Sequence, residues 1–242
     1  MKDKLFNSDS VAGKFRFDES VAEVFDDMLA RSIPYYSDMQ RMITTLAQKH
    51  YQEGSRIYDL GCSTGTTILN LSARIKSDRL KIIGIDSSQP VIERARLKLD
   101  DAGLANAELV CKDVMEAEIK NASVVIMNYT LQFIPPDKRH DLLKKIYEGL
   151  LQGGILLLSE KVLEESSQAT ELFIEEYYDF KRIMGYSELE ISRKREALDD
   201  VLIPFTTKEE SALLGGAGFE ASSIFFKCYN FASFIAFKGS GK

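Results

Sequence analysis

The stretch that organises the chain is residues 57–71, with the sequence IYDLGCSTGTTILNL. Its first four residues are a short apolar run that includes one carboxylate, Asp59, and this pattern predicts a buried strand. Gly61 and Gly65 follow, and glycine allows backbone angles and close approaches that a side chain would forbid. Apolar residues then resume at helical spacing from Thr66. A strand that breaks into a glycine turn and then a helix is typical of the ligand-binding edge of an open α/β sheet.

Outside residues 57–71, the apolar periodicity predicts strands that alternate with helices, which favours a mostly parallel sheet covered on both faces. Two neighbouring strands close the chain, and so short a turn between them requires antiparallel pairing. The fold class is therefore α/β, with a mostly parallel seven-stranded sheet and an antiparallel closing strand. The expected strands are 57–60, 80–85, 108–111, 122–127, 155–158, 219–226 and 229–237, and the expected helices start near 18, 36, 66, 90 and 136, with helical character over 166–201.

The chain has the size and composition of one globular domain. It has 242 residues, of which 45% are hydrophobic and 28% are charged, and a chain of this length buries roughly 70–75% of its unfolded surface. We expect residues 1–242 to form a single domain. Residues 1–53 would comprise an N-terminal arm and two helices. The arm would be loose over residues 1–17, although Phe15 and Phe17 could pack onto the rest of the protein. Residues 160–202 would be a helical lid insertion.

The charge and the cysteines exclude several classes of function. The net charge of −6 disfavours a broad nucleic-acid surface. The three cysteines form no C-x-x-C pair, so we expect no disulfide framework, no zinc site and no other metal. His50 and His140 lie among polar residues, which argues against histidine catalysis. No apolar run approaches the roughly 20 residues that span a bilayer, and no signal sequence is evident, so we expect a cytoplasmic protein without membrane contact.

Four polar side chains fall at the carboxyl ends of successive expected strands: Asp59, Asp86, Asp113 and Asn128. Asp86 lies 25 residues beyond Gly61 (86 − 61 = 25), close to the offset of about 20 residues at which an acidic residue accepts hydrogen bonds from ribose hydroxyls. A carboxylate suits two vicinal hydroxyls because it offers two acceptor oxygens. The alternative for Asp86 is a cap of the following helix.

The next two strand ends suggest the rest of a nucleoside. Asp113 could accept from an adenine amino group while the Val114 amide donates to the ring, or Asp113 could be a surface turn residue. Asn128 would face a ligand or cap a turn. A diphosphate cofactor would need small residues or a lysine at this turn. The segment 62–64, Cys-Ser-Thr, has larger side chains and no lysine, so an adenosine with a non-phosphate tail fits better.

Together these residues resemble the class I S-adenosylmethionine-dependent methyltransferase family, with its Rossmann-like fold, over about residues 54–237. Ser63 stands where that family often has glycine, which leaves less room beside the methionine tail. Further segments resemble the family of carboxy-S-adenosyl-L-methionine synthases over nearly the whole chain, and the last two are the most specific to it. These segments are 17–25, 32–37, 128–133, 158–161 and 179–195.

The resemblance implies an unusual reaction. S-adenosyl-L-methionine would be a co-substrate, and prephenate would lose its ring carboxylate to give phenylpyruvate. The deprotonated methyl carbon of the sulfonium would trap the carbon dioxide and form carboxy-S-adenosyl-L-methionine. The product would serve a separate enzyme that carboxymethylates a wobble uridine of tRNA, and the synthase would be a homodimer. The net charge of −6 argues against direct tRNA binding by this chain.

The resemblance also implies the site residues. Arg195 would be the catalytic residue and would hold the carboxylate, because a guanidinium binds a carboxylate through two parallel hydrogen bonds and stays charged. Without the resemblance, the charged run 193–195 is typical of a solvated helix face. Arg195 and Tyr36 would contact the substrate, and the residues that contact the nucleoside would be Tyr36, Gly61, Cys62, Ser63, Asp86, Ser87, Asp113, Val114 and Asn128.

Two other functions remain open from the sequence. The first is a conventional S-adenosylmethionine-dependent methyltransferase that acts on a small acid or on tRNA. The second is a non-catalytic S-adenosylmethionine-binding regulator of a partner enzyme. The residues do not identify the group that deprotonates the sulfonium methyl, and a substrate-derived anion is the candidate base.

Overall fold

The computed structural model describes residues 3, 5, 15 and 17–239. Its main sheet has the strand order β3-β2-β1-β4-β5-β8-β7, and β8 is antiparallel to both of its neighbours. This confirms the mostly parallel seven-stranded sheet with an antiparallel closing strand; a two-residue strand, β6, is added beside β5. The strands are β1 (Arg56–Leu60), β2 (Lys81–Asp86), β3 (Ala107–Cys111), β4 (Ala122–Asn128), β5 (Leu150–Leu163), β6 (Phe205–Thr206), β7 (Ala221–Cys228) and β8 (Phe231–Phe237).

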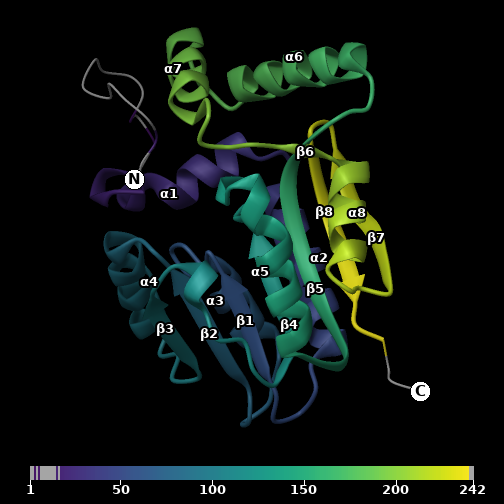
Figure 1. The fold of residues 1–242 in the computed structure, drawn as a ribbon. Coiled ribbons are helices and arrows are strands. Elements are labelled where there is room, and N and C mark those ends of the chain that lie inside the picture. Colours follow the sequence, from purple (N-terminus) through teal and green to yellow (C-terminus); the bar gives the residue numbers. More distant parts are fainter. Residues whose placement is uncertain (1–2, 4, 6–14, 16, 240–242) are drawn as a thin grey trace.

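Helices cover both faces of the sheet and form a separate layer above its carboxyl edge (Figure 1). The α-helices are α1 (Glu19–Ser32), α2 (Tyr36–His50), α3 (Thr66–Arg74), α4 (Gln89–Asp101), α5 (Pro136–Gly149), α6 (Ser167–Ile183), α7 (Glu188–Leu198) and α8 (Thr207–Gly216), with short 3-10 helices at Val114–Glu116 and Leu131–Phe133. Asp18 caps α1 as its sequence position predicts, because its Oδ1 accepts from the N–H of Val21 (3.1 Å).

The structure differs from the expected elements in three places. The helical stretch 166–201 is two helices, since Gly185 adopts φ +84° and Ser187 forms a capping box that starts α7. Strand β5 is much longer than the expected 155–158, because it begins directly after α5 and continues to Leu163. Helix α8 was not expected from the sequence. Most of the expected loose arm, residues 1–17, lies outside the described residues.

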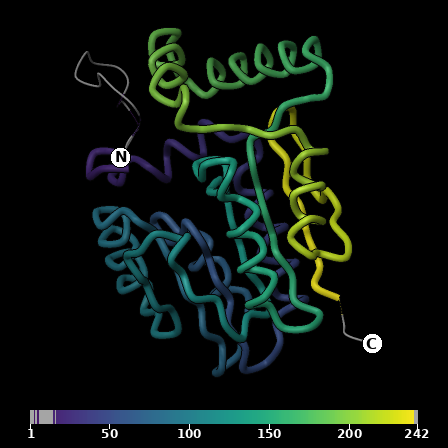
Figure 2. The backbone as a smooth tube through the Cα atoms, in the orientation of Figure 1, coloured from purple at the N-terminus to yellow at the C-terminus, as the bar shows by residue number. Residues whose placement is uncertain are grey.

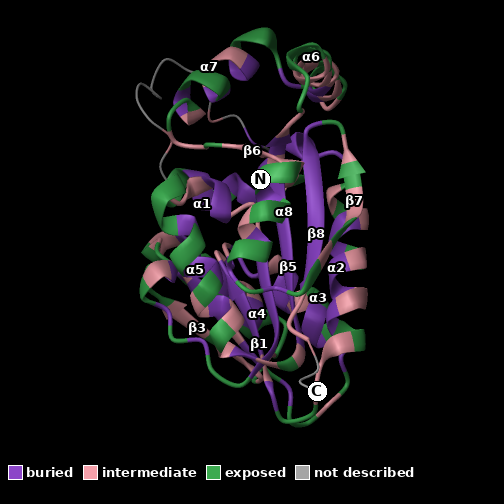
Figure 3. Ribbon diagram, turned by 45° about the vertical axis from the view of Figure 1, so that its right-hand side comes forward, coloured by how far each residue is buried: buried purple, intermediate pink, exposed green. Residues whose placement is uncertain are grey.

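The apolar core lies in two layers, one on each face of the sheet. In β4, Val124 and Ile126 face the layer that α2, α3 and α4 cover, whereas Val125 and Met127 face the layer under α5 and α8. All four side chains are fully buried, and each contributes about 1.5–3 kcal/mol to folding. Figure 3 shows the buried strands between helices whose outer faces are exposed. This rigid sheet fixes the positions of the strand ends.

Helices α6 and α7 lie above the carboxyl edge of the sheet, and the chain returns from them to the sheet through β6 (Figure 2). Polar contacts join this layer to α1. Nε of Arg31 donates to the carbonyl oxygen of Met184 (2.9 Å), and its guanidinium stacks on the Tyr186 ring at 4.1 Å. Nζ of Lys194 donates to Oγ of Ser32 (2.8 Å). The layer is therefore held over the sheet as a roof.

Candidate active site

A cavity of about 690 Å³ lies between the carboxyl ends of the strands, helix α1 and the roof formed by α6 and α7. The loops after β1, β2, β3 and β4 form its floor, as the rule for open α/β sheets predicts. Of the four strand-end groups, Asp59 is absent from the cavity wall. Every site residue expected from the sequence lines this one cavity: Tyr36, Gly61, Cys62, Ser63, Asp86, Ser87, Asp113, Val114, Asn128 and Arg195.

The glycine turn after β1 has no space for a side chain at Gly61. Gly61 adopts φ +76°, and a Cβ atom on it would lie 2.1 Å from Oγ1 of Thr130. Ser63 also has a left-handed backbone, with φ +49°, which glycine adopts at less cost. This backbone explains why a glycine is expected at position 63, and the serine leaves its hydroxyl buried without a hydrogen-bond partner among the described residues.

The Asp86 carboxylate is fixed at the cavity wall by the backbone. Oδ2 accepts from the N–H of Ser63 (3.0 Å), and Oδ1 accepts from the N–H of Ser88 (3.0 Å). Burial raises the pKa of this carboxyl. The bond from Ser88 is the helix-cap contact that was the alternative for Asp86, and it does not exclude a ligand, since each carboxylate oxygen has a second lone pair. Asp113 similarly accepts from the N–H of Met115 (2.8 Å) while lining the cavity.

Asp59 lies behind the glycine turn and is 1% exposed. Neither of its carboxylate oxygens has a hydrogen-bond partner among the residues that the structure describes. Burial, together with the negative charge of Asp86, raises its pKa to about 7. Burial also raises the pKa of the neighbouring Cys62 thiol, so this thiol is not an activated nucleophile.

A chain of hydrogen bonds connects α2 to the end of β4. Nε2 of Gln40 donates to the hydroxyl of Tyr36 (3.1 Å) and to Oγ1 of Thr67 (3.2 Å). Nδ2 of Asn128 donates to the same Thr67 oxygen (3.2 Å). This bond orients Asn128 and leaves its Oδ1 without a partner in the described part of the chain. The buried Oδ1 is therefore an acceptor available to a ligand.

Three lysines line the cavity away from the glycine turn, and the sequence analysis did not identify them as site residues. Lys161 is on β5, Lys181 on α6 and Lys194 on α7, and all three line the cavity. Burial lowers the pKa of Lys161 to about 8 and that of Lys194 to about 8. The pKa of Lys181 is lowered to about 6 by burial and by the other two cations. Arg195 joins them, and its side chain is exposed.

A buried carboxylate holds the loop that follows β4. Glu160 accepts from the N–H groups of Leu131 (3.0 Å) and Gln132 (2.9 Å). Oε1 of Gln132 accepts in turn from the N–H of Lys161 (2.9 Å), and the Gln132 carbonyl accepts from Nη2 of Arg139 (3.2 Å). The position of Lys161 is thus fixed by hydrogen bonds through its own backbone.

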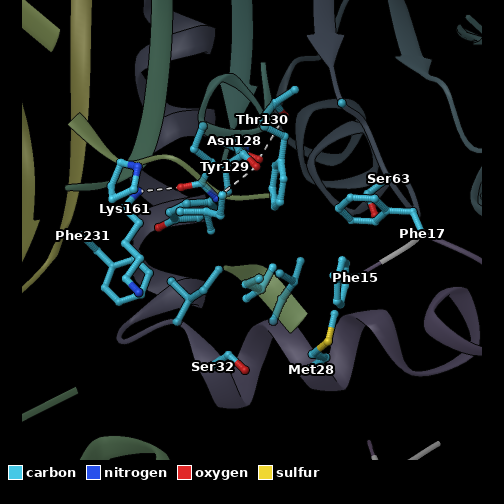
Figure 4. A pocket seen from close by; sticks show the side chains of 18 of the residues that line it. Phe15, Phe17, Met28, Ser32, Ser63, Asn128, Tyr129, Thr130, Lys161 and Phe231 are labelled. Carbon is cyan, nitrogen blue, oxygen red and sulfur yellow. Dashed lines mark hydrogen bonds between the residues drawn. The ribbon is translucent and has the colours of Figure 1, made fainter. Parts of the chain in front are cut away.

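Phe15 and Phe17 close the end of the cavity that lies farthest from the lysines. In Figure 4 they lie with Ser63 on one side, Lys161 and Phe231 lie on the other, and Asn128 with Tyr129 lies between them. The cavity is therefore elongated, with one end at the glycine turn and one end at the lysines. Within the described ranges, no group of three or more His, Cys, Asp and Glu side chains could hold a metal ion. No helix in those ranges is long and apolar enough to cross a bilayer.

Comparison with known proteins gives a family for this geometry. The methyltransferase domain family matches residues 57–154. The carboxy-S-adenosyl-L-methionine synthase of Actinobacillus pleuropneumoniae is 46% identical over 239 residues, which cover 98% of this chain and 99% of that protein. The synthase of Trichlorobacter lovleyi is 47% identical over 226 residues, covering 93% of each chain.

Solved structures of lower identity share the fold. An O-methyltransferase family protein from Burkholderia thailandensis has a TM-score of 0.66 and 17% identity, with coverage of 93% of this chain and 62% of that one. Human N-acetylserotonin methyltransferase in complex with S-adenosylmethionine has a TM-score of 0.60 and 17% identity, with coverage of 91% and 55%. With a methyltransferase fold and up to 47% identity along nearly its full length, the chain belongs to the carboxy-S-adenosyl-L-methionine synthase family.

Proposed function

We propose that this chain converts S-adenosyl-L-methionine and prephenate to carboxy-S-adenosyl-L-methionine and phenylpyruvate. The observation that carries this proposal is a single cavity with two chemically different ends. One end has acceptors suited to a nucleoside, Asp86 and Asp113, and the other has the basic side chains Lys161, Lys181 and Arg195. A conventional methyl transfer to a neutral acceptor does not require several basic side chains, whereas two substrates with carboxylate groups are bound by them.

The order of the strands supports the placement of the nucleoside. Asp113, Asp86, Gly61 and Asn128 lie at the carboxyl ends of β3, β2, β1 and β4, which are consecutive in the sheet. Three inter-strand steps span roughly 14 Å, a length that suits an extended nucleoside with an amino-acid tail. Asp113 and Val114 would contact adenine and Asp86 with Ser87 the ribose. The tail would lie along Tyr36, Gly61, Cys62, Ser63 and Asn128.

The reaction balances without a catalytic base from the protein. The bond between the prephenate ring and its carboxylate breaks, and carbon dioxide leaves. The electron pair left in the ring aromatises it and expels the ring hydroxyl as hydroxide. Hydroxide takes a proton from the sulfonium methyl to give water, and the resulting ylide carbon forms a bond to carbon dioxide. The described residues that line the cavity include no histidine, which agrees with a base supplied by the substrate.

Arg195 is the group proposed to hold the new carboxylate. Arg195 lines the cavity, and its guanidinium has no ion-pair partner among the described residues. A planar fork of donors orients a carboxylate through two bonds and also holds it by charge. Arg195 would thereby keep carbon dioxide and then the carboxymethyl group beside the sulfur.

The test is the mass of the nucleoside product. Purified protein with S-adenosyl-L-methionine and prephenate is expected to give a nucleoside heavier by one carbon dioxide, together with phenylpyruvate. If S-adenosylhomocysteine forms instead in the presence of a small acid or tRNA, the protein is a conventional methyltransferase. If S-adenosylmethionine binds without turnover of any acid, the protein is a non-catalytic regulator. Either result contradicts the proposal.

The destination of the product is a further part of the proposal. The product would pass to a separate enzyme that carboxymethylates a tRNA wobble uridine in the cytoplasm, and this chain would act as a homodimer. The net charge of −6 supports a chain that leaves tRNA binding to that enzyme. Light scattering tests the dimer, and a tRNA mobility-shift assay at low salt tests nucleic-acid binding; tight, salt-sensitive binding would contradict this part.

A further inference from the structure

Two lysine side chains are enclosed at one end of the cavity without an anion. Lys181 is 4% exposed and Lys161 is half-buried. Among the described residues, neither Nζ atom has a hydrogen-bond acceptor or a carboxylate within ion-pair distance. Their recorded contacts are with aromatic rings: Nζ of Lys181 lies 4.5 Å and Nζ of Lys161 lies 5.2 Å from the centroid of Tyr177. Enclosed ammonium groups are costly unless a counter-charge accompanies them.

An unpaired amide lies beside these lysines. Asn230 is 4% exposed and lines the cavity, and both its Nδ2 and its Oδ1 lack a hydrogen-bond partner in the described structure. It directly precedes Phe231, which is opposite Lys161 in the pairing of β5 with β8. A buried amide with no partner is rare in proteins. The same place therefore holds two lysine amines and an amide that no group among the described residues satisfies.

This end of the cavity is separate from the expected nucleoside site. Strand β5 is two strands from β1 in the sheet, so the two strands are roughly 10 Å apart, and Lys161 lies two residues beyond the partner of Asn128 in β5. In Figure 4, Lys161 and Phe231 lie at the opposite end from Ser63, and Tyr129 lies between. A nucleoside that contacts Asp86 and the turn leaves the lysine end for a second substrate.

We propose that Lys161, Lys181 and Asn230 form the subsite for the carboxylate that the second substrate retains, which is the 2-oxo acid carboxylate of prephenate and then of phenylpyruvate. This inference rests on the proposed function. Two ammonium groups balance one carboxylate and its neighbouring carbonyl dipole, and Asn230 donates a further hydrogen bond. The rings of Tyr177 and Phe231, 5.1 Å apart between centroids, form an apolar wall beside the charges.

The retained carboxylate fits this subsite better than the transferred one. The transferred carboxylate loses its charge as carbon dioxide departs, so a tight cation clamp would stabilise the ground state more than the transition state and slow the reaction. The retained carboxylate keeps its charge throughout, and strong binding there improves affinity and orientation without that penalty. Arg195 then remains free for the carboxylate that forms on the sulfonium.

Direct binding measurements test this subsite independently of turnover. The protein is first saturated with S-adenosylhomocysteine, and prephenate is then titrated in by calorimetry for the wild type, Lys161→Met, Lys181→Met and Lys181→Arg. Lys144→Met is the matched control, since Lys144 is exposed on α5 outside the cavity. We expect the two cavity Lys→Met variants to bind prephenate about 30-fold more weakly or worse, and Lys181→Arg to retain most of the affinity. S-adenosylhomocysteine affinity should stay within about threefold in all variants.

The other results separate the subsite from the proposed reaction. If the Lys→Met variants lose affinity for S-adenosylhomocysteine instead, the lysines hold the methionyl carboxylate of the nucleoside. If prephenate affinity is unchanged, or if the folded wild type does not bind prephenate, the subsite assignment is wrong. A wild type that binds prephenate through the lysines but forms no carboxylated nucleoside leaves the subsite standing and refutes the proposed reaction. Thermal unfolding of each variant confirms that it is folded.

Discussion

Lys161 and Lys181 hold their Nζ atoms against the same ring, that of Tyr177, although one lysine belongs to β5 of the sheet and the other to α6 of the roof. A desolvated cation–π contact contributes about 2 kcal/mol. Enclosing an ammonium group costs several kcal/mol, so one shared ring does not offset two of them. The protein without substrate therefore carries an electrostatic cost at the joint between sheet and roof, which an anion would relieve.

The first prediction is that Lys181→Met stabilises the ligand-free protein. At pH 7 the Lys181 amine must give up its proton when the protein folds, because its pKa falls to about 6 in the folded state. Replacing it by an apolar side chain of similar length removes this cost and is expected to add about 1–3 kcal/mol at pH 7, or a rise in Tm of roughly 2–10 °C. Scanning calorimetry on the two proteins measures this difference. A substitution that destabilises the fold at every pH would show that Lys181 is a structural residue.

The stabilisation should depend on pH. The pKa of Lys181 is about 6 in the folded protein and 10.5 for the free side chain. Between these values the unfolded chain binds a proton that the folded chain does not, so wild-type stability rises with pH across this window. The advantage of Lys181→Met is thus largest near pH 6 and shrinks toward pH 10. Lys144→Met should show no such trend in its difference from the wild type.

The second prediction concerns Asp59. Its pKa is raised from 3.8 to about 7 in the folded protein, so the folded state holds a proton between these values that the unfolded state has lost. The contribution of Asp59 to stability therefore falls as the pH rises from about 4 to 7. Asp59→Asn removes this titration, and its stability relative to the wild type should increase by about 1–3 kcal/mol between pH 4.5 and pH 8. Urea unfolding at the two pH values measures the change, and an equal difference at both would refute it.

The third prediction separates backbone strain from steric overlap at the glycine turn. Gly61→Ala should destabilise the protein by at least about 2 kcal/mol, because the new Cβ atom would lie 2.1 Å from Oγ1 of Thr130 and the backbone is left-handed. Gly54→Ala is the matched control, since Gly54 has φ +78° but no atom within 4 Å of the added Cβ. It should show the backbone cost of about 1 kcal/mol alone. Equal losses of unfolding free energy in the two variants would show that Thr130 moves aside freely.

The sequence predicts the sheet edge well because its signals are local. An apolar run followed by a carboxylate, as at Asp86, marks both the end of a strand and the ligand edge in a parallel sheet. Asp59 obeys the same pattern, yet it lies behind the turn, because strands β2 and β4 pair on both sides of its strand and bury it. Periodicity alone does not distinguish these two cases.

The lysine end of the cavity depends on contacts between distant segments. Lys161 lies beyond the expected strand 155–158, because pairing with β8 continues to Lys161 and pairing with β6 then extends β5 to Leu163. Lys181 enters the cavity through the packing of α6 over that strand, and a lysine in a charged helix is usually a solvated residue. Its enclosure becomes visible only when the ring of Tyr177 and the strand end are placed together in space.

The last prediction distinguishes the role of Arg195 from general electrostatics. Arg195→Ala should reduce formation of the carboxylated nucleoside at least about 100-fold, since it removes the bidentate partner of the new carboxylate. Arg195→Lys should restore part of the rate, because an ammonium supplies charge without the planar fork. S-adenosylhomocysteine carries no such carboxylate, so its affinity should change less than about threefold in both variants. Arg94→Ala, on the exposed face of α4, controls for the loss of one positive charge. Product analysis by mass spectrometry measures these rates, and undiminished product in Arg195→Ala would assign carboxylate binding to the lysines alone.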